Sequence, residues 1–362
     1  MKTPDAGGDC QPFRILSLDG GGIRGAFIAG FLADLEAKVG CHLADYFDLI
    51  AGTSTGGIIA AGLALRESAE KIEKLYRERG ALIFARRQPL PVTGPLQRAR
   101  AWFIGKYLRP HGLDFDQLQQ SKYEAKALKD ALTEVFGSKT IEDARTRLVI
   151  PAVDLTRGQT IVFKTPHIPG MYRDRHYRFV DVILATSAAP TYFPHAQISE
   201  GSSYVDGGLW ANNPSVVAIA EALKIRDAAN REGIDLPIQQ ENIYLLSVGT
   251  GNASYFAKPP VGGAGILWWA PQFYNISSVA QSQGINFQAQ YILGDRSHRI
   301  DYDLPDGRWN LDSVDILRQM IKIGRERSHE NFAKLSPIFF QSKAFHPYFA
   351  FPDAPGKAAT RE

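Results

Sequence analysis

The most constraining feature of this 362-residue chain is an apolar segment, Tyr46–Ala51, that runs directly into Gly52-Thr53-Ser54-Thr55-Gly56. An apolar strand followed by Gly-x-Ser-x-Gly and a helix of small residues is typical of a nucleophile elbow, a tight turn that exposes a serine hydroxyl. The flanking glycines suit a turn that leaves little room for Cβ atoms. Ser54 is therefore the first candidate nucleophile. On this motif alone the alternative stays open, in which the turn only caps a structural helix.

A second motif lies one strand earlier. Phe13–Leu18 is predicted to be a strand, residues 27–39 carry a helical apolar stripe, and Asp19-Gly20-Gly21-Gly22-Ile23-Arg24-Gly25 joins them. A glycine-rich turn before a helix presents backbone N–H groups and the positive end of the helix dipole to an anion. The turn is thus an oxyanion hole or a phosphate cradle, and Arg24 is expected to steady it or to contact a phosphate.

The same turn also satisfies the dinucleotide-binding pattern Gly20-x-Gly22-x-x-Gly25, so a dinucleotide-binding oxidoreductase is the first alternative. That function expects an acidic residue at the end of the second strand, where it would bind the ribose hydroxyls. Here the strand ends in Ala51-Gly52-Thr53-Ser54, and Asp45 and Asp48 lie at its start and middle. The pattern favours a hydrolase.

Two further stretches complete a family pattern, namely Ala185–Pro194 and Tyr204-Val205-Asp206-Gly207-Gly208. Together with the glycine-rich turn and the serine turn, and in the same order, they resemble the motifs of the patatin-like phospholipases, which are lipid acyl hydrolases. The resemblance implies an α/β fold with three layers, in which helices flank a mainly parallel central sheet. It covers roughly residues 13–220.

The resemblance also implies the chemistry. Ser54 would attack the acyl carbonyl, Asp206 would take the serine proton directly, and the amides of Gly20, Gly21 and Gly22 would receive the oxyanion. The glycines that support these turns would be Gly52, Gly56, Gly207 and Gly208. No cofactor and no metal is implied.

The sequence itself gives a reason for this convergence. Residues 203–205 are predicted to form a strand that ends at Asp206, and the carboxyl ends of parallel strands share one edge of a sheet. The alternative within the hydrolases is a Ser-Asp-His triad. His195, just after Phe193-Pro194, is its first candidate among eight histidines: His42, His111, His167, His176, His195, His298, His329 and His346.

Composition sets modest bounds. A net charge of +3 gives no reason to expect a nucleic-acid partner, and two cysteines provide neither a disulfide framework nor a metal pattern, which favours the cytoplasm. No apolar run reaches the ~18 residues of a membrane span, so membrane contact is expected to be peripheral. We expect a flexible tail at 1–12, a catalytic domain at 13–220, and a remainder at 221–362 that completes the core with a strand near 243–248 and adds a lid-like loop and helices.

Three segments are candidates for contacts with lipids or ligands. Residues 86–112 contain basic and aromatic but no acidic side chains, which is typical of a surface that meets anionic headgroups or phosphates, or of a solvated insertion. Residues 258–271 are either a lid or a packed loop. Some bacterial patatin-like enzymes are antiviral effectors switched on by a cyclic dinucleotide, and residues 172–178 are a further candidate for phosphate contacts. A constitutive hydrolase is the alternative.

Overall fold

The computed structural model describes residues 11–85, 121–199, 201–234, 236–252, 265–269, 273–303 and 311–345, with single positions at 94, 95, 98, 102, 106, 263 and 348. Within these residues the strands form one mixed sheet in the order β5-β6-β3-β2-β1-β7-β8, with β4 also paired to β3. The strands are β1 (Phe13–Leu18), β2 (Leu49–Gly52), β3 (Arg147–Asp154), β4 (Gln159–Lys164), β5 (Ala196–Ser199), β6 (Ser202–Asp206), β7 (Ile243–Val248) and β8 (Ser297–Ile300).

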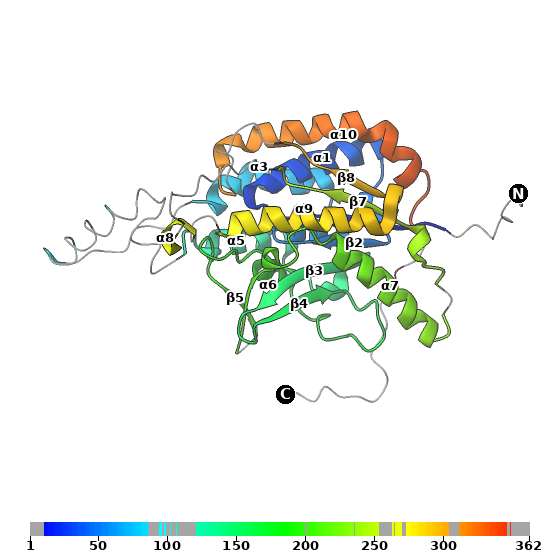
Figure 1. Ribbon diagram of the computed structural model, residues 1–362, viewed down its shortest axis with the longest axis horizontal. Coiled ribbons are helices and arrows are strands. Elements are labelled where there is room, and N and C mark those ends of the chain that lie inside the picture. Colours follow the sequence, from blue (N-terminus) through cyan, green and yellow to red (C-terminus); the bar gives the residue numbers. More distant parts are fainter. Residues whose placement is uncertain are drawn as a thin grey trace, which may run out of the picture.

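The pairings of β3, β2, β1, β7 and β8 are all parallel, whereas β4, β5 and β6 pair in antiparallel fashion. Helices cover both faces of the sheet (Figure 1). They are α1 (Gly25–Val39), α2 (Thr55–Ala64), α3 (Ala69–Ile83), α5 (Ala125–Phe136), α6 (Phe179–Thr186), α7 (Ser215–Arg231), α8 (Ile266–Trp269), α9 (Phe273–Leu293) and α10 (Leu317–Phe339).

Alternating side chains of β1 divide the core into two layers. Leu16 and Leu18 pack with α1, α2, α3 and α10, whereas Phe13 and Ile15 pack with α7 and α9. Every residue of β1 is buried, as expected for a strand covered on both faces. The predicted three-layer α/β fold with a mainly parallel sheet is therefore confirmed.

The arrangement around β3 determines where the candidate site forms. β4 pairs with β3 from Val149 to Asp154, so β2 and β6 must share the other edge of β3. On that edge β2 pairs up to Val149 and β6 pairs from Ala152 onward in the opposite direction. The carboxyl ends of β2 and β6 consequently meet head to head. Asp206 reaches the Ser54 turn in this way and not, as we expected, as the end of a parallel strand.

Two helix boundaries differ from what the sequence pattern predicts. The pattern predicts a helix at 68–79 that Gly80 ends, but α3 continues to Ile83, and Gly80 packs closely against Leu317 and Ile23. It also predicts a helix at 311–327, whereas α10 begins at Leu317 and extends to Phe339. The 21-residue α9 and the strand β8 were not predicted. α9 packs on the same core layer as Phe13 and Ile15 of β1, and β8 pairs with β7.

No helix among the described residues combines the length and the apolar character that crossing a bilayer requires.

Candidate active site

Ser54 lies between β2 and α2 in a backbone conformation that is rare for a residue with a side chain, at φ +53° and ψ −120°. Such a conformation costs about 1–3 kcal/mol and persists only where the surroundings impose it. Here the Ser54 amide donates to Thr186 Oγ1 at 3.0 Å, and that hydroxyl donates to the carbonyl of Pro151 in β3 at 2.6 Å. The turn is therefore anchored to the same strand that positions Asp206.

The predicted turn glycines Gly52 and Gly56 lie where backbones touch. A Cβ on Gly52 would be 2.2 Å from the carbonyl oxygen of Gly56, and one on Gly56 would be 2.2 Å from that of Leu18. A Cβ atom cannot lie so close to a backbone oxygen, so both positions require glycine. The sharp turn described for Ser54 depends on them.

Asp206 is fully buried, and its Oδ1 accepts a hydrogen bond from the Gly208 amide at 2.7 Å. Burial raises the pKa of the Asp206 carboxyl to about 7, against the effect of donors from Gly208, Ser54 and Tyr274. The second oxygen, Oδ2, is buried and accepts no hydrogen bond of normal length and angle from the described residues. A carboxylate with a pKa near neutrality is a much stronger base than an exposed aspartate, whose pKa is ~4.

The glycine-rich turn follows β1 at the same edge of the sheet. The amide of Gly20 donates to the carbonyl of Asn212 at 2.9 Å and is therefore occupied. The amides of Gly21 and Gly22 have no hydrogen-bond partner among the described residues, which favours them over Gly20 as donors to an oxyanion. Arg24 is buried, and its Nε donates to the Gly21 carbonyl at 3.4 Å, which is a steadying contact within the turn.

A buried ion-pair network supports this turn from the C-terminal half of the chain. Arg299 of β8 donates to both carboxylate oxygens of Asp19, at 2.9 and 2.7 Å, and to Asp301 at 2.7 Å. The Ser282 hydroxyl of α9 also donates to Asp19, at 2.9 Å. The position of the candidate oxyanion donors thus depends on residues beyond the four sequence motifs.

Tyr274, at the start of α9, was missed by sequence reasoning. A Cβ on Gly208 would lie 2.5 Å from the Tyr274 hydroxyl and 3.0 Å from Asp206 Oδ1, so the two groups face the same small space. Burial and the neighbouring Asp206 raise the pKa of Tyr274 well above its usual value, which keeps it a neutral donor. The segment around it contains no recognisable motif, so the sequence offered no signal.

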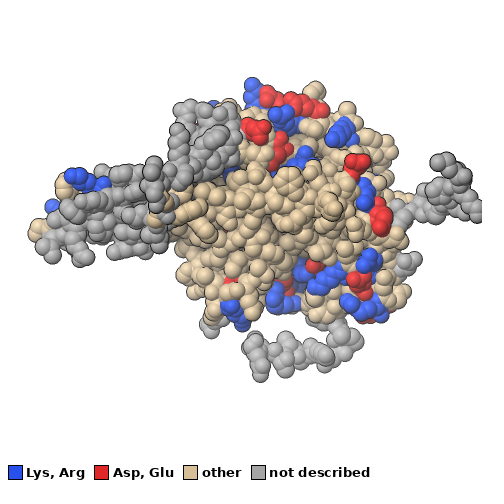
Figure 2. Space-filling view, viewed as in Figure 1, with Lys and Arg blue, Asp and Glu red and all other residues tan. Residues whose placement is uncertain are grey.

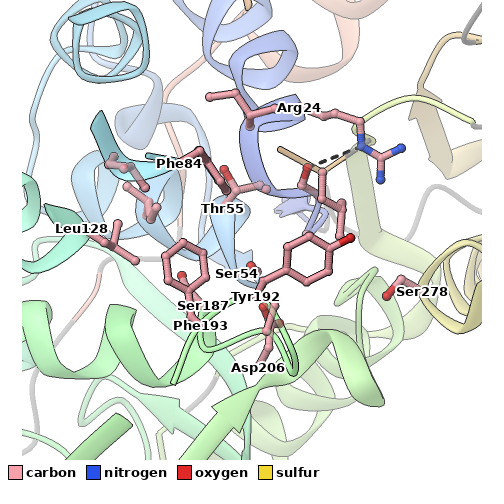
Figure 3. A pocket seen from close by; sticks show the side chains of 18 of the residues that line it. Arg24, Ser54, Thr55, Phe84, Leu128, Ser187, Tyr192, Phe193, Asp206 and Ser278 are labelled. Atoms are coloured by element: carbon pink, nitrogen blue, oxygen red, sulfur yellow. Dashed lines mark hydrogen bonds between the residues drawn. The ribbon is translucent and has the colours of Figure 1, made fainter. Parts of the chain in front are cut away.

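An apolar pocket opens beside Ser54 and Asp206. In Figure 3 Phe84, Leu128 and Phe193 lie on one side of Ser54 and Asp206, and Ser278 lies on the other. Further apolar lining comes from Ile23, Ile58, Ile83 and Leu311. A pocket with this apolar lining suits a hydrocarbon chain more than a charged group.

None of the described histidines lines this cavity. His195 is exposed, and His167 is buried in a separate cluster, where it bonds Thr165 and Glu221. Burial lowers the pKa of His167 to about 4. His111 and His346 lie outside the described residues. No described histidine is therefore placed to act as the base of a catalytic triad.

The structure also bears on the residues considered for binding a dinucleotide or a phosphate group. Asp48 accepts from the Arg14 amide at 2.8 Å and so takes part in backbone packing, which leaves the dinucleotide alternative without its acidic residue. In the 172–178 segment the arginines are already engaged, for example Arg173 with Asp174 and Arg175 with Glu142. Most of 86–112 and of 258–271 lies outside the described residues.

A serine on an imposed tight turn, a buried carboxylate of raised basicity and an apolar pocket are the features expected of serine hydrolases that act on apolar esters. The chain belongs to the patatin-like phospholipase family, whose model matches residues 16–219. It is accordingly a lipid ester hydrolase, and the family, fold and enzyme class expected from the four motifs are confirmed.

Individual relatives match over most of the chain. It is 34% identical to the cGAMP-activated phospholipase of Vibrio cholerae serotype O1, over 94% of this chain and 95% of that protein. A protein of the same description from Pseudomonas aeruginosa is 33% identical over 80% of this chain and 78% of its own length. Among solved structures, VipD from Legionella pneumophila covers 90% of this chain and 67% of its own, with 12% identity and a TM-score of 0.43.

Proposed function

We propose that the protein hydrolyses carboxylic ester bonds of membrane phospholipids through a Ser54–Asp206 dyad. The observation that supports this most directly is the buried carboxylate of Asp206, with its pKa near neutrality, at the head-to-head junction that also holds Ser54. Ionised Asp206 is a base of suitable strength for a serine hydroxyl, and we propose that the acyl chain enters the apolar pocket beside it.

The steps follow from these positions. Ser54 Oγ attacks the ester carbonyl carbon, and its proton passes to Asp206. The tetrahedral oxyanion is stabilised by the amides of Gly21 and Gly22, which are preorganised and need no reorientation. Collapse breaks the bond to the leaving alcohol, which takes the proton from Asp206. Water then attacks the acyl-serine while Asp206 accepts its proton, and Asp206 returns that proton to Ser54 Oγ as the bond to the acyl group breaks and the fatty acid is released.

In this proposal residues 13–220 supply the reacting groups, and residues 221–362 complete the core and hold the glycine-rich turn through Arg299 and α9. The substrate is part of a membrane, so we propose a cytoplasmic protein that binds the membrane surface peripherally when active. The basic and aromatic stretch at 86–112 is the proposed contact with anionic lipid.

The decisive experiment compares wild type with Ser54→Ala and Asp206→Asn, assayed on a p-nitrophenyl ester and by labelling with a fluorophosphonate. Both variants should lose several orders of magnitude in turnover, because the nucleophile and its base act as a unit. Ser54→Ala should also lose the label. Wild-type turnover in either variant, or labelling of another serine, would refute the dyad.

We further propose that a cyclic dinucleotide switches on the activity, because the two relatives above are named as cGAMP-activated phospholipases. Release of fatty acid from phospholipid vesicles, measured with and without cGAMP, tests this step separately. Activation by cGAMP in wild type and none in Ser54→Ala is expected. Equal activity in both conditions would show a constitutive hydrolase and would leave the dyad intact.

A further inference from the structure

The outward face of α9 has no charge. None of its 21 residues is acidic or basic, yet its side chains include some of the most exposed aromatic residues in the described part of the chain. Phe287 is 69% exposed and Tyr291 is 95% exposed, and they are one helical turn apart on the same face. In Figure 2, viewed as in Figure 1, the area over the middle of α9 shows no Lys, Arg, Asp or Glu.

The same face contains a glycine that the fold itself does not need. A Cβ on Gly284 would meet no atom within 4 Å, so nothing inside the molecule demands its absence. Glycine is one of the least favourable residues in a helix interior. Gly284 lies one turn before Phe287 and one turn after the exposed Ala280, so two small residues stand next to the aromatic ones on this face. The separation of two packed helices depends on the side chains at their contact, and small residues permit a close approach.

We propose that α9 forms the interface of a homodimer, in which Ala280, Gly284, Phe287 and Tyr291 of one chain pack against the same residues of a second copy around a two-fold axis. In a two-fold interface the same patch is used on both chains, and a residue near the axis meets its own copy, so a charge there would face a like charge. The face of α9 contains no charge and avoids this repulsion. Interface centres are likewise depleted in charge and enriched in aromatic residues.

The exposed area is of the right order. A Phe or Tyr side chain buries ~150–250 Å², so Phe287 and Tyr291 at their exposed fractions would contribute roughly 250–400 Å². That is between about a third and a half of the ~800 Å² that each partner contributes to a standard interface. A lipid surface is the less suitable occupant, because helices that lie on membranes carry Lys or Arg beside their apolar face, and α9 has none.

The inward face of the same helix holds the active site. Gln281 donates to the carbonyl of Leu209 at 2.6 Å, and Ser282 donates to Asp19. Association through the outward face would therefore brace the wall that supports Asp206 and the glycine-rich turn. This inference concerns assembly and holds whether or not a cyclic dinucleotide regulates the enzyme.

Sedimentation velocity of the full chain tests the proposal. Wild type at tens of micromolar should sediment as a dimer, and Phe287→Glu should raise the dimer dissociation constant at least about tenfold. Leu155→Glu is the matched control, because Leu155 is 53% exposed in the turn between β3 and β4 and away from α9. Circular dichroism and turnover of a soluble ester establish that both variants are folded.

Gly284→Ala gives a sharper test, because it should stabilise the monomer and destabilise the dimer. Alanine favours the helix, so the melting temperature of the dilute, monomeric protein should rise. Its methyl group would stand between the two helices, so association should weaken. A monomeric wild type, or equal dimerisation of Phe287→Glu and wild type, would overturn the proposal. So would a Phe287→Glu variant that sediments as wild type and loses binding to vesicles, since that result would assign the face to lipid.

Discussion

Replacing Asp206 by asparagine should destroy activity and at the same time stabilise the fold. The buried carboxylate is needed as a base, but its negative charge is held in a site that penalises it, which is why its pKa is raised to about 7. Asparagine retains an oxygen for the Gly208 amide, which donates to Oδ1 at 2.7 Å, and removes the charge. The perturbation therefore separates the catalytic benefit of the charge from its cost to stability.

The magnitude follows from the pKa shift. The ordinary value for aspartate is 3.8, so a folded-state pKa of about 7 corresponds to a penalty of about 4 kcal/mol when the group is fully ionised. The folded state binds the proton more tightly than the unfolded state does. Wild-type stability relative to the variant should therefore be unaffected below about pH 4, decline between about pH 4 and 7, and level off above pH 7.

Denaturant unfolding of both proteins at a series of pH values between 5 and 9 measures this difference. The variant should be the more stable protein throughout, by an amount that grows up to about pH 7 and then stays near 4 kcal/mol. Asp227→Asn, at a half-exposed surface position on α7, is the control and should show no such trend. A difference that does not change with pH, or a variant less stable than wild type at pH 8, would refute the reasoning.

Three further predictions concern the site. Hydrolysis should decline below about pH 7 in a pH–rate profile, as Asp206 becomes protonated. Tyr274→Phe removes a donor to this carboxylate, so it should raise the pKa of Asp206 and move the decline to higher pH. His195→Ala should keep ester turnover close to wild type; a loss as deep as that of a nucleophile variant would indicate a triad. Gly56→Ala would place a Cβ 2.2 Å from the Leu18 carbonyl oxygen and should lower the free energy of unfolding by about 1–3 kcal/mol, as seen by denaturant titration.

The strand, turn and helix around Ser54 could be predicted from sequence because their determinants are local. Gly52 and Gly56 are required by atoms within the same turn or the adjacent strand, and the apolar β1 and β2 are continuous in the chain. The glycine-rich turn was recognisable for the same reason. Which of its amides is free was not, because the Gly20 amide is occupied by Asn212, which is distant in sequence.

Tyr274 and the direction of β6 were beyond local reasoning. α9 alternates polar and apolar residues without a pronounced amphipathic pattern, so neither its length nor the burial of Tyr274 could be read from it. The direction of β6 depends on its pairing with β3, which the short segment 203–205 does not encode. The structure places Asp206 beside the Ser54 turn, but by the antiparallel pairing of β6 with β3 and not by the parallel arrangement that we expected.

The head-to-head junction on β3 makes one strand the spacer between the nucleophile and its base. A residue inserted between Val149 and Ala152 would displace Asp206 by ~3.3 Å along the strand and turn its side chain to the opposite face of the sheet. The connections that lie between Ser54 and Asp206 in the sequence are under no such constraint, because lengthening a surface loop costs little free energy. Homologous enzymes can therefore gain long insertions in those loops, and we expect the length of β3 to stay fixed wherever the dyad is used.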